Sequence, residues 1–233
     1  MSAKKVTAGL YRGKGPYRSR FIAGAVAFVL IIEYSVTEAI TALAWKNPVY
    51  SYVHNFISDL GVSGPPVIFE GRHIYSPWYW LMNTGFIIEG ILAVTAAFLL
   101  RPLLTSKASR ITIISLALLH GAGMFMVAIV HGSPGTLHAR IGIVHVIGAS
   151  LAIILGNVEC IWAGVAAAKS GAPHWYQWYS IFLGTLGLAG LFFLLGVRSI
   201  PPGITERISV NTIICWDVTT GIFLLAGIKS SKL

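Results

Sequence analysis

Six long runs of mostly apolar residues dominate this chain and constrain its fold more than any other feature. A helix needs about 20 consecutive apolar residues to cross the hydrocarbon core of a bilayer, where the backbone finds no water to bind. Only 11% of the residues are charged, against about 25% in a typical soluble domain. We therefore predict an all-α integral membrane bundle of about six transmembrane helices. Their expected ranges are residues 21–45, 79–100, 111–130, 139–168, 177–197 and 208–228.

The segments between these runs differ in their content of basic residues, and this difference predicts an orientation. One set of segments, which includes both ends of the chain, carries twelve Lys or Arg residues, whereas the alternate set carries five. Cytoplasmic segments of membrane proteins are the ones enriched in Lys and Arg. We therefore expect a multi-pass protein of the cytoplasmic (plasma) membrane with both termini in the cytoplasm. The formal net charge of +9 then reflects orientation, and binding to nucleic acid is not expected.

The same reasoning divides the chain into two parts. Residues 1–20 form a basic cytoplasmic arm suited to anionic lipid headgroups, and residues 21–233 form a single six-helix transmembrane domain. Residues 46–78 make one long loop on the external side. A loop of this length is usually either functional or disordered, and its aromatic and proline residues favour an ordered loop.

The external loop contains the stretch His-Asn-Phe-Ile-Ser-Asp-Leu-Gly, which ends at Gly61. Its apolar residues recur at helical spacing and Gly61 fits a helix end, so we expect a short amphipathic helix. Either its polar side chains bond the loop backbone and hold the loop in place, or His54 and Asp59 help to line a site. The polar side chains are His54, Asn55, Ser58 and Asp59.

A group of histidines occupies the predicted external turn between the third and fourth spans. His131 and His138 flank the turn, and His145 follows on the next helix. His138 and His145 are seven residues apart, which places them about 10 Å apart along a helix axis, too far to share one metal ion. A divalent metal would need one of this pair together with His131, His54 or Asp59. The alternative, which the spacing favours, is that these histidines bond neighbouring helices or lipid headgroups.

The segment Gly-Ile-Thr-Glu-Arg-Ile-Ser-Val-Asn opens the last span on the external side. We expect Thr205 to cap that helix and Glu206 to suit its positive end. Arg207 and Asn211 are four residues apart and would share one helix face. The guanidinium of Arg207 either binds an anionic headgroup or forms a structural pair with Asp59.

Several ionisable side chains lie within the predicted spans, where charged groups are costly and normally face the bundle interior. They permit a proton path or a polar cavity, or they form hydrogen bonds between helices. Haem held by two histidines is a further alternative, but His120 and His145 lie at different depths and fit it poorly. The intramembrane polar residues are Glu33, Glu38, Glu89, His120, Glu159 and Asp217.

Two motifs resemble those of the DUF998 family of polytopic membrane proteins, whose function is unknown. That family pairs an Ile-Ser-Asp-Leu-Gly stretch after its first helix with a Gly-x-x-Glu-Arg stretch before its last, and here these are residues 57–61 and 203–207. The turn that bears His138 is similar to a third family motif, although Val130-His131-Gly-Ser-Pro replaces its usual Phe-Pro-x-Asp-like start. The resemblance implies six helices and no particular reaction. The motif positions that it implies are Ser58, Asp59, His138, Glu206 and Arg207.

Three functions are compatible with these observations. The first is a membrane-embedded enzyme or binding protein for a lipid or other apolar substrate, with His138, Asp59 and His54 as catalytic candidates. The second is a non-catalytic subunit or sensor that packs against membrane-protein partners. The third is a proton-coupled transporter that uses intramembrane carboxyls such as Glu33, Glu89 and Asp217. The substrate-binding candidates are Arg207, Asn55, Ser58, Glu206, Asn211 and His145.

Contact with membrane lipids is expected in all three cases. The sequence identifies no cofactor, and a divalent metal at His131 and His138 is an alternative that the residue spacing does not favour.

Overall fold

The computed structural model of this chain describes residues 16–197 and 199–230. Within those residues, six helical segments are long and apolar enough to cross a membrane, which confirms the prediction of an all-α membrane bundle. The predicted basic arm, residues 1–20, lies mostly outside the described part of the chain. The six spans are Arg18–Ala44, Tyr79–Leu103, Lys107–Ile129, Gly142–Lys169, His174–Gly196 and Pro202–Gly227.

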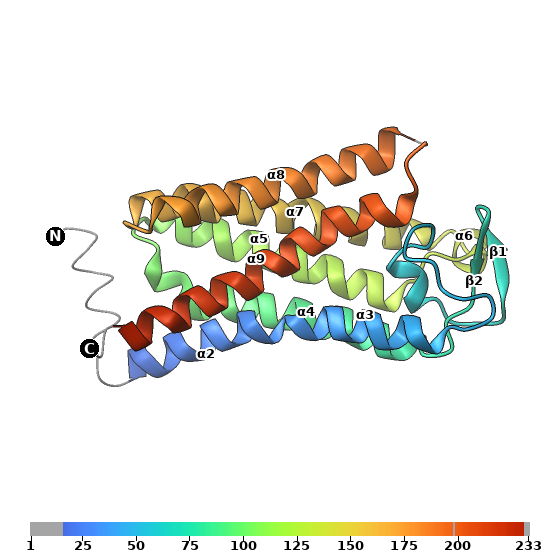
Figure 1. The fold of residues 1–233 in the computed structure, drawn as a ribbon, viewed down its shortest axis with the longest axis horizontal. Helices are drawn as coiled ribbons and strands as arrows, with labels where there is room; N and C mark the ends of the chain where they lie inside the picture. Colours follow the sequence, from blue (N-terminus) through green and yellow to red (C-terminus); the bar gives the residue numbers. More distant parts are fainter. Residues whose placement is uncertain (1–15, 198, 231–233) are drawn as a thin grey trace.

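The spanning helices run along the long axis of the molecule, and the described chain begins and ends at the same end of the bundle (Figure 1). We call this the terminal end and the opposite one the loop end. The first span consists of α2 (Pro16–Leu30) and α3 (Ile32–Ala44), which are separated only at Ile31. The other spanning helices are α4 (Tyr79–Leu100), α5 (Lys107–Ile129), α7 (Gly142–Lys169), α8 (His174–Gly196) and α9 (Pro202–Ser230).

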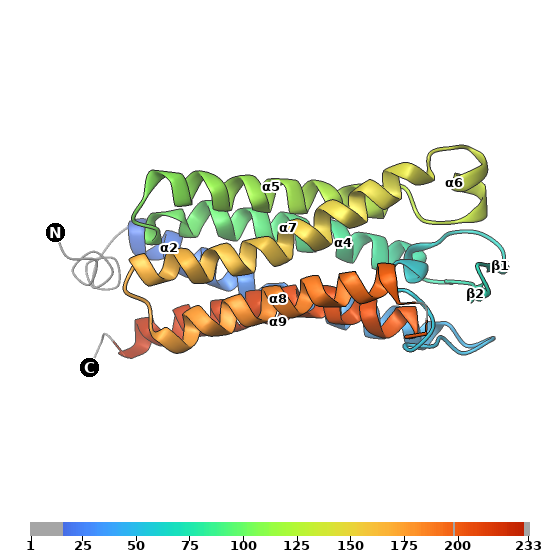
Figure 2. The same ribbon diagram turned by 90° about the horizontal axis from the view of Figure 1, so that it is seen from above.

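The spanning helices pack into a closed ring (Figures 1 and 2). Helix α4 contacts α2 and α5, α7 lies between α5 and α8, and α9 returns to contact both α8 and α2. Small residues allow the closest approaches: a Cβ atom on Gly123 would lie 2.5 Å from the carbonyl oxygen of Gly148. Helices α5 and α7 therefore pack backbone to backbone, as membrane helices often do.

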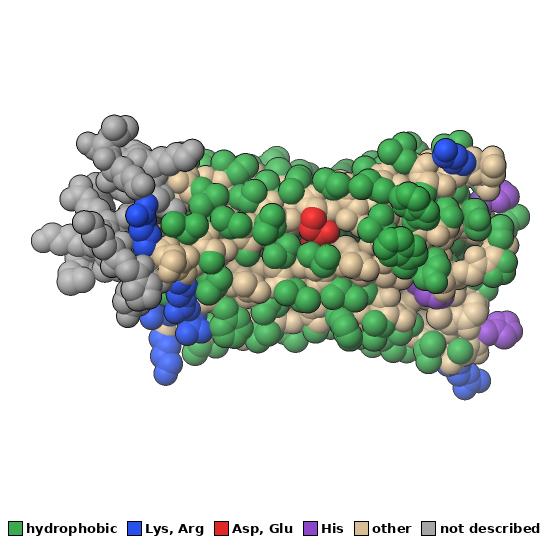
Figure 3. Space-filling model, turned by 90° about the horizontal axis from the view of Figure 1, so that it is seen from below, with side chains coloured by type: hydrophobic (Ala, Val, Ile, Leu, Met, Phe, Trp, Pro, Cys, Tyr) green, Lys and Arg blue, Asp and Glu red, His purple; other side chains and the backbone are tan. Residues whose placement is uncertain are grey.

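Apolar side chains cover the sides of the bundle, and on the face in Figure 3 Lys and Arg lie only near its two ends. Phe192 and Leu195 are 69% and 79% exposed, whereas Glu89 and Asn157 are fully buried. A soluble protein would reverse this distribution, because water solvates polar groups and excludes apolar ones. The arrangement is that of a multi-pass membrane protein with a polar interior.

Short elements gather at the loop end, and they show that the long loop after the first span is structured, as predicted. It contains the 3-10 turn η1 (Ser58–Gly61) and a hairpin of strands β1 (Val67–Phe69) and β2 (Arg72–Ile74). The hairpin turns through Glu70 and Gly71, whose φ angles of 48° and 76° are the positive values that a two-residue turn requires. The remaining short elements are α6 (Pro134–His138) at the loop end and η2 (Arg101–Leu103) at the terminal end.

The predicted amphipathic helix within this loop is wrong, because the stretch forms one isolated turn between Ser51 and Asn55 and the short 3-10 turn of residues 58–61, with no continuous helix. Polar side chains bond the local backbone instead, which competes with helix formation. The side-chain oxygen of Asn55 accepts a hydrogen bond from the Ser51 N–H, and the carboxylate of Asp59 accepts one from the Phe56 N–H. The chain therefore turns before Ser58 and does not continue as a helix.

The predicted start of the last helix is also wrong. Helix α9 begins at Pro202, so Thr205 lies within the helix and is not its cap. The Thr205 hydroxyl donates to the Pro202 carbonyl at 3.1 Å. Proline is well suited to the first helical position, since its φ angle is already helical and no N–H is needed there. The earlier start places Glu206 and Arg207 on the second turn of a regular helix.

Candidate functional site

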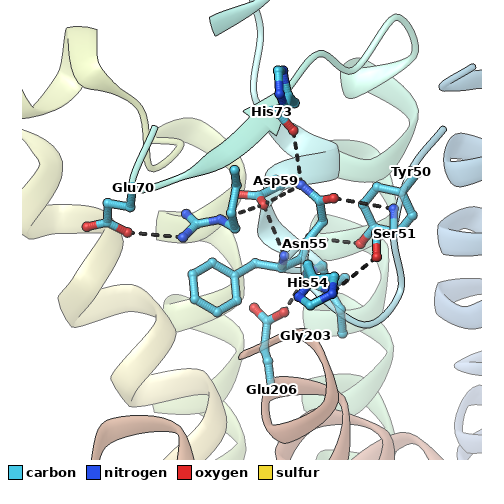
Figure 4. Close-up of polar contacts among 12 residues, drawn as sticks. Tyr50, Ser51, His54, Asn55, Asp59, Glu70, His73, Gly203 and Glu206 are labelled. Atoms are coloured by element: carbon cyan, nitrogen blue, oxygen red, sulfur yellow. Dashed lines mark hydrogen bonds and ion pairs between the residues drawn. The ribbon is translucent and has the colours of Figure 1, made fainter. Parts of the chain in front are cut away.

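A first buried polar group at the loop end is centred on Asp59, whose side chain is only 3% exposed (Figure 4). The Arg72 guanidinium donates to its carboxylate at 3.0 Å, and the Asn55 amide donates at 3.2 Å. The same Asn55 amide reaches the His73 carbonyl at 3.1 Å. Burial raises the pKa of the Asp59 carboxyl, although Arg72 and Asn55 act in the opposite direction. These contacts fasten the hairpin to η1 and to the turn that precedes it.

A second group is centred on Arg207 of α9, which fastens the loop to the first and last spans. Its guanidinium pairs with Glu38 of α3, with Nε 3.0 Å and Nη2 2.9 Å from the same carboxylate oxygen. It also donates to the Tyr50 hydroxyl at 2.5 Å and to the carbonyls of Tyr52 and Asn55 at 2.8 and 3.0 Å. Burial raises the pKa of the Tyr50 hydroxyl, so Tyr50 stays neutral. The predicted pairing of Arg207 with Asp59 is therefore wrong, since each has its own partner.

The Gly-x-x-Glu-Arg motif has a geometric explanation at this junction. A Cβ on Gly203 would lie 2.6–2.7 Å from three loop carbonyl oxygens, so only glycine lets the loop rest on the start of α9. Glu206, 8% exposed, accepts a hydrogen bond from the Ile57 N–H. Arg207 binds loop carbonyls from the next position. One turn of α9 thus offers both an acceptor and donors to the same loop.

The candidate histidines make no hydrogen bond to Asp59 or Arg207 within the described chain, although His145 interacts electrostatically with Asp59. His54 and His138 are exposed, and no hydrogen bond in the described chain joins His138 to Asp59 or Arg207. His131 Nε2 lies 2.9 Å from the Ser63 hydroxyl, and His145 Nδ1 lies 2.8 Å from the Val130 carbonyl oxygen. Burial lowers the pKa of the His131 imidazole, which favours its neutral form at neutral pH.

The alternative of a metal at His131 and His138 stays a prediction. The described residues contain no group of three or more His, Cys, Asp or Glu side chains that could hold a metal ion. The other two candidates lie apart from the histidines: Ser58 is half-buried over a small internal cavity, and Asn211 is exposed on α9.

A separate polar cluster lies midway along the bundle and is centred on a buried pair, Glu89 of α4 and His120 of α5. His120 Nε2 is 2.9 Å from one Glu89 carboxylate oxygen and 3.2 Å from the other. Its Nδ1 atom is 2.8 Å from the Ala152 carbonyl oxygen. Because a carbonyl can only accept, Nδ1 must carry a proton, and Nε2 and Glu89 are left to share one more.

Glu159 of α7 and Asp217 of α9 complete this mid-bundle cluster. They are 6% and 3% exposed, and no hydrogen bond to either carboxyl occurs in the described chain. Both interact electrostatically with Glu89 and His120. Three carboxyls thus surround one imidazole, an imbalance that is costly in a buried site unless protons or other cations compensate.

Glu33, half-exposed on α3, accepts a hydrogen bond from Thr37 at 3.2 Å and interacts electrostatically with Glu89 of the mid-bundle cluster. Figure 3 shows an acidic side chain reaching the surface midway along the bundle, among apolar groups.

Two cavities approach the mid-bundle cluster from opposite ends. A cavity of about 40 Å³ is lined by Ser58 and Glu206 at the loop end and by Glu89 and His120. This is room enough for ordered water, which these polar groups could bind. A larger cavity of about 300 Å³ is lined by η2 and the turn between α7 and α8 at the terminal end, and it reaches inward to Glu159. The mid-bundle cluster therefore separates two internal spaces.

Six apolar spans around a buried polar interior define the class: a polytopic α-helical membrane protein. The chain belongs to the DUF998 family, described as "Protein of unknown function", whose family profile matches residues 22–222. This match confirms the resemblance carried by the two loop-end motifs. No curated protein and no solved structure matches the chain.

Sequence reasoning missed three residues that organise these sites. Arg72 holds Asp59, and a hairpin turn at Glu70-Gly71 was the available signal that would bring it back over the loop. Tyr50 binds Arg207 but carries no comparable signal. Asn157 is fully buried between α7 and α9, where its amide donates to the Ser209 carbonyl at 2.8 Å. Its role depends on helix packing that one sequence does not reveal.

Proposed function

We propose that the protein is a proton-coupled carrier for a lipophilic molecule, with its terminal end in the cytoplasm. The observation that supports this proposal is the placement of the mid-bundle cluster between two cavities that extend toward opposite ends of the bundle. A carrier needs a binding space inside the membrane and a titratable group that faces it. Ionisable groups buried within spans commonly mark such proton pathways.

The Glu89–His120 pair is suited to passing a proton. Ala152 holds the Nδ1 proton in place, so the exchangeable proton lies either on His120 Nε2 or on Glu89, atoms that are 2.9 Å apart. Its transfer converts an imidazolium and a carboxylate into an imidazole and a carboxylic acid without any backbone movement. Water in the small cavity would connect this pair to Ser58 and Glu206 on the loop side.

Coupling follows from electrostatics. Glu159 interacts with both members of the pair and also lines the large cavity. A change of proton occupancy at Glu89 and His120 therefore alters the potential that a molecule in the large cavity experiences. Two sites that affect each other's occupancy in this way share a coupling free energy, and the effect is reciprocal.

The proposed orientation rests on charge. Among the described side chains, six basic residues lie at the terminal end and four at the loop end, and cytoplasmic segments are the more basic ones. The terminal-end residues are Arg18, Arg20, Arg101, Lys107, Arg110 and Lys169. The loop-end residues are Lys46, Arg72, Arg140 and Arg207.

An enzyme at the loop end remains an untested prediction with less support. Asp59 and Arg207 are already held by other protein groups, and His138 is an exposed side chain with no hydrogen bond to either of them. General acid–base catalysis needs groups within hydrogen-bond reach of one substrate, directly or through one water. The loop-end contacts are better explained as a structural lock.

Proteoliposomes test the proposed function. Vesicles loaded with the pH dye pyranine receive an inward proton gradient. The measurement is made with and without each of three lipophilic probes: the cation tetraphenylphosphonium, the anion tetraphenylborate and the neutral diphenylmethanol. We expect at least one probe to accelerate proton movement beyond protein-free vesicles. Glu89→Gln should abolish the acceleration, whereas Glu70→Gln, an exposed carboxyl of the loop-end hairpin that lines neither cavity, should retain it. Equal rates with and without protein for all probes would refute the proposal.

A further inference from the structure

The large cavity carries two features that together indicate a ligand class. Its volume of about 300 Å³ lies at the lower end of the range of small-molecule sites. Its walls come from most of the spanning helices and are almost wholly apolar. The exceptions with formal charge are Glu159, deep in the bundle, and Arg101, at the terminal end.

We propose that this cavity binds a lipophilic organic cation, with the carboxylate of Glu159 as its counter-charge. The proposal deepens the proposed function, on which it rests for its role in transport, by naming the substrate class. The binding site itself is argued from the cavity alone.

Glu159 is an unpartnered buried carboxyl that faces the cavity. It is 94% buried, since only 6% of its surface is exposed, and no hydrogen bond to it occurs in the described chain. The nearest cationic candidate, His120, already has both ring nitrogens bonded, to Glu89 and to Ala152. A carboxylate without a partner is costly to bury, so a positively charged ligand would supply the missing interaction.

Aromatic side chains around the same cavity favour an organic cation over a metal ion. Phe28 and Trp216 meet edge to face at 5.6 Å, and Tyr176 and Phe223 stack at 5.2 Å, and all four line the cavity. Aromatic faces attract cations, and cages of such rings are a common way to recognise substituted ammonium groups. Few oxygen ligands line the cavity, so a hard metal ion would find too little coordination there.

The position of Arg101 favours the same polarity of ligand. An anionic amphiphile would place its charge at Arg101 near the terminal end and bury an apolar tail against Glu159. A cationic ligand instead places its charge at Glu159 and its apolar body against the aromatic walls, away from Arg101. Only the cationic ligand gives the buried Glu159 carboxylate a partner of opposite charge.

Two probes of the same shape and opposite charge test the inference. Purified protein in lipid nanodiscs is titrated with radiolabelled tetraphenylphosphonium in a scintillation proximity assay, with empty nanodiscs subtracted. We expect saturable binding that Glu159→Gln weakens by about tenfold or more, because a charge contact in a desolvated site is lost. Glu33→Gln, the matched control outside the cavity, should bind within about twofold of the natural chain.

Competition measurements keep the inference falsifiable without any variant. Unlabelled tetraphenylphosphonium should displace the label, and radiolabelled tetraphenylborate, titrated in a separate sample because the two ions precipitate together, should not bind saturably. Phe28→Leu should weaken binding several-fold by removing one aromatic face. Absence of saturable tetraphenylphosphonium binding, saturable binding of tetraphenylborate, or unchanged binding in Glu159→Gln would each overturn the inference.

The outcomes separate the two proposals. Proton movement in proteoliposomes without tetraphenylphosphonium binding would support the proposed carrier function and refute the cationic substrate. Tetraphenylphosphonium binding that depends on Glu159, without any proton movement, would support the cation site and refute the proposed carrier function.

Discussion

The loop end and the middle of the bundle both bury charged groups, but they treat them differently. At the loop end, Asp59 and Glu38 each have an arginine partner, and Glu206 accepts a backbone N–H. In the mid-bundle cluster, Glu159 and Asp217 have no hydrogen-bond partner among the described residues. Buried polar groups are normally satisfied, and those that are not call for an explanation such as an exchangeable ligand. The loop-end contacts therefore stabilise the fold, and the mid-bundle cluster is where we propose that protons and ligand bind.

The largest expected effect comes from breaking the buried pair of Arg207 and Glu38 at the loop end. Arg207→Ala leaves Glu38 buried without its partner, and removing one member of a buried pair costs about 3–5 kcal/mol. We expect a correspondingly large fall in melting temperature in detergent. Asn211→Ala, an exposed position one turn further along α9, serves as the control. Equal melting temperatures for the two variants would show that the loop-end contacts do not stabilise the fold.

A smaller loss is expected where the loop rests on α9. Gly203→Ala forces a methyl group toward three carbonyl oxygens at 2.6–2.7 Å, and such overpacking costs about 1–3 kcal/mol. Gly196→Ala is the matched control, because a Cβ there meets nothing within 4 Å. Differential scanning fluorimetry of both variants measures the difference. If Gly203→Ala and Gly196→Ala have equal melting temperatures, the loop does not approach α9 as closely as described.

A substitution in the mid-bundle cluster should not lower the free energy of unfolding, in contrast to the two loop-end substitutions. Glu159→Gln replaces a buried carboxyl that has no hydrogen-bond partner to lose among the described residues, so the free energy of unfolding should stay constant or rise by about 1 kcal/mol or less. Chemical denaturation in detergent at neutral pH measures this change. A loss as large as that of Arg207→Ala would erase the distinction between the two regions.

The smallest effect concerns pH and the Asp59 carboxyl. Because burial raises its pKa in the folded state, the folded protein holds this proton more tightly than the unfolded chain. The resulting stability is present below the unfolded pKa of about 3.9 and is lost as pH rises through the raised folded value. Asp59→Asn should remove this decline from melting curves recorded upward from about pH 4. Glu70→Gln, an exposed partner of Arg72, should keep it.

The sequence predicted helices more successfully than contacts, for a physical reason. An apolar run such as 79–100 determines its own helix, because the bilayer imposes length and backbone bonding locally. The partner of a buried charge depends on tertiary approach: Arg207 and Glu38 are 169 residues apart in the chain. Asp59 and Arg207 share an end of the bundle, yet a nearby hairpin supplied Asp59 with Arg72. The two cavities likewise arise only from packing.

The closed ring of helices also has a consequence for biosynthesis. Helix α9 leaves the ribosome after the other five spans, yet it carries Glu206 and Arg207, the groups that bind the loop made after the first. Until α9 inserts, Glu38 lacks its arginine and the loop lacks its anchor. The loop end can therefore reach its native structure only after α9 has been synthesised. A nascent chain halted earlier would expose the unpaired Glu38 carboxylate to cellular quality control.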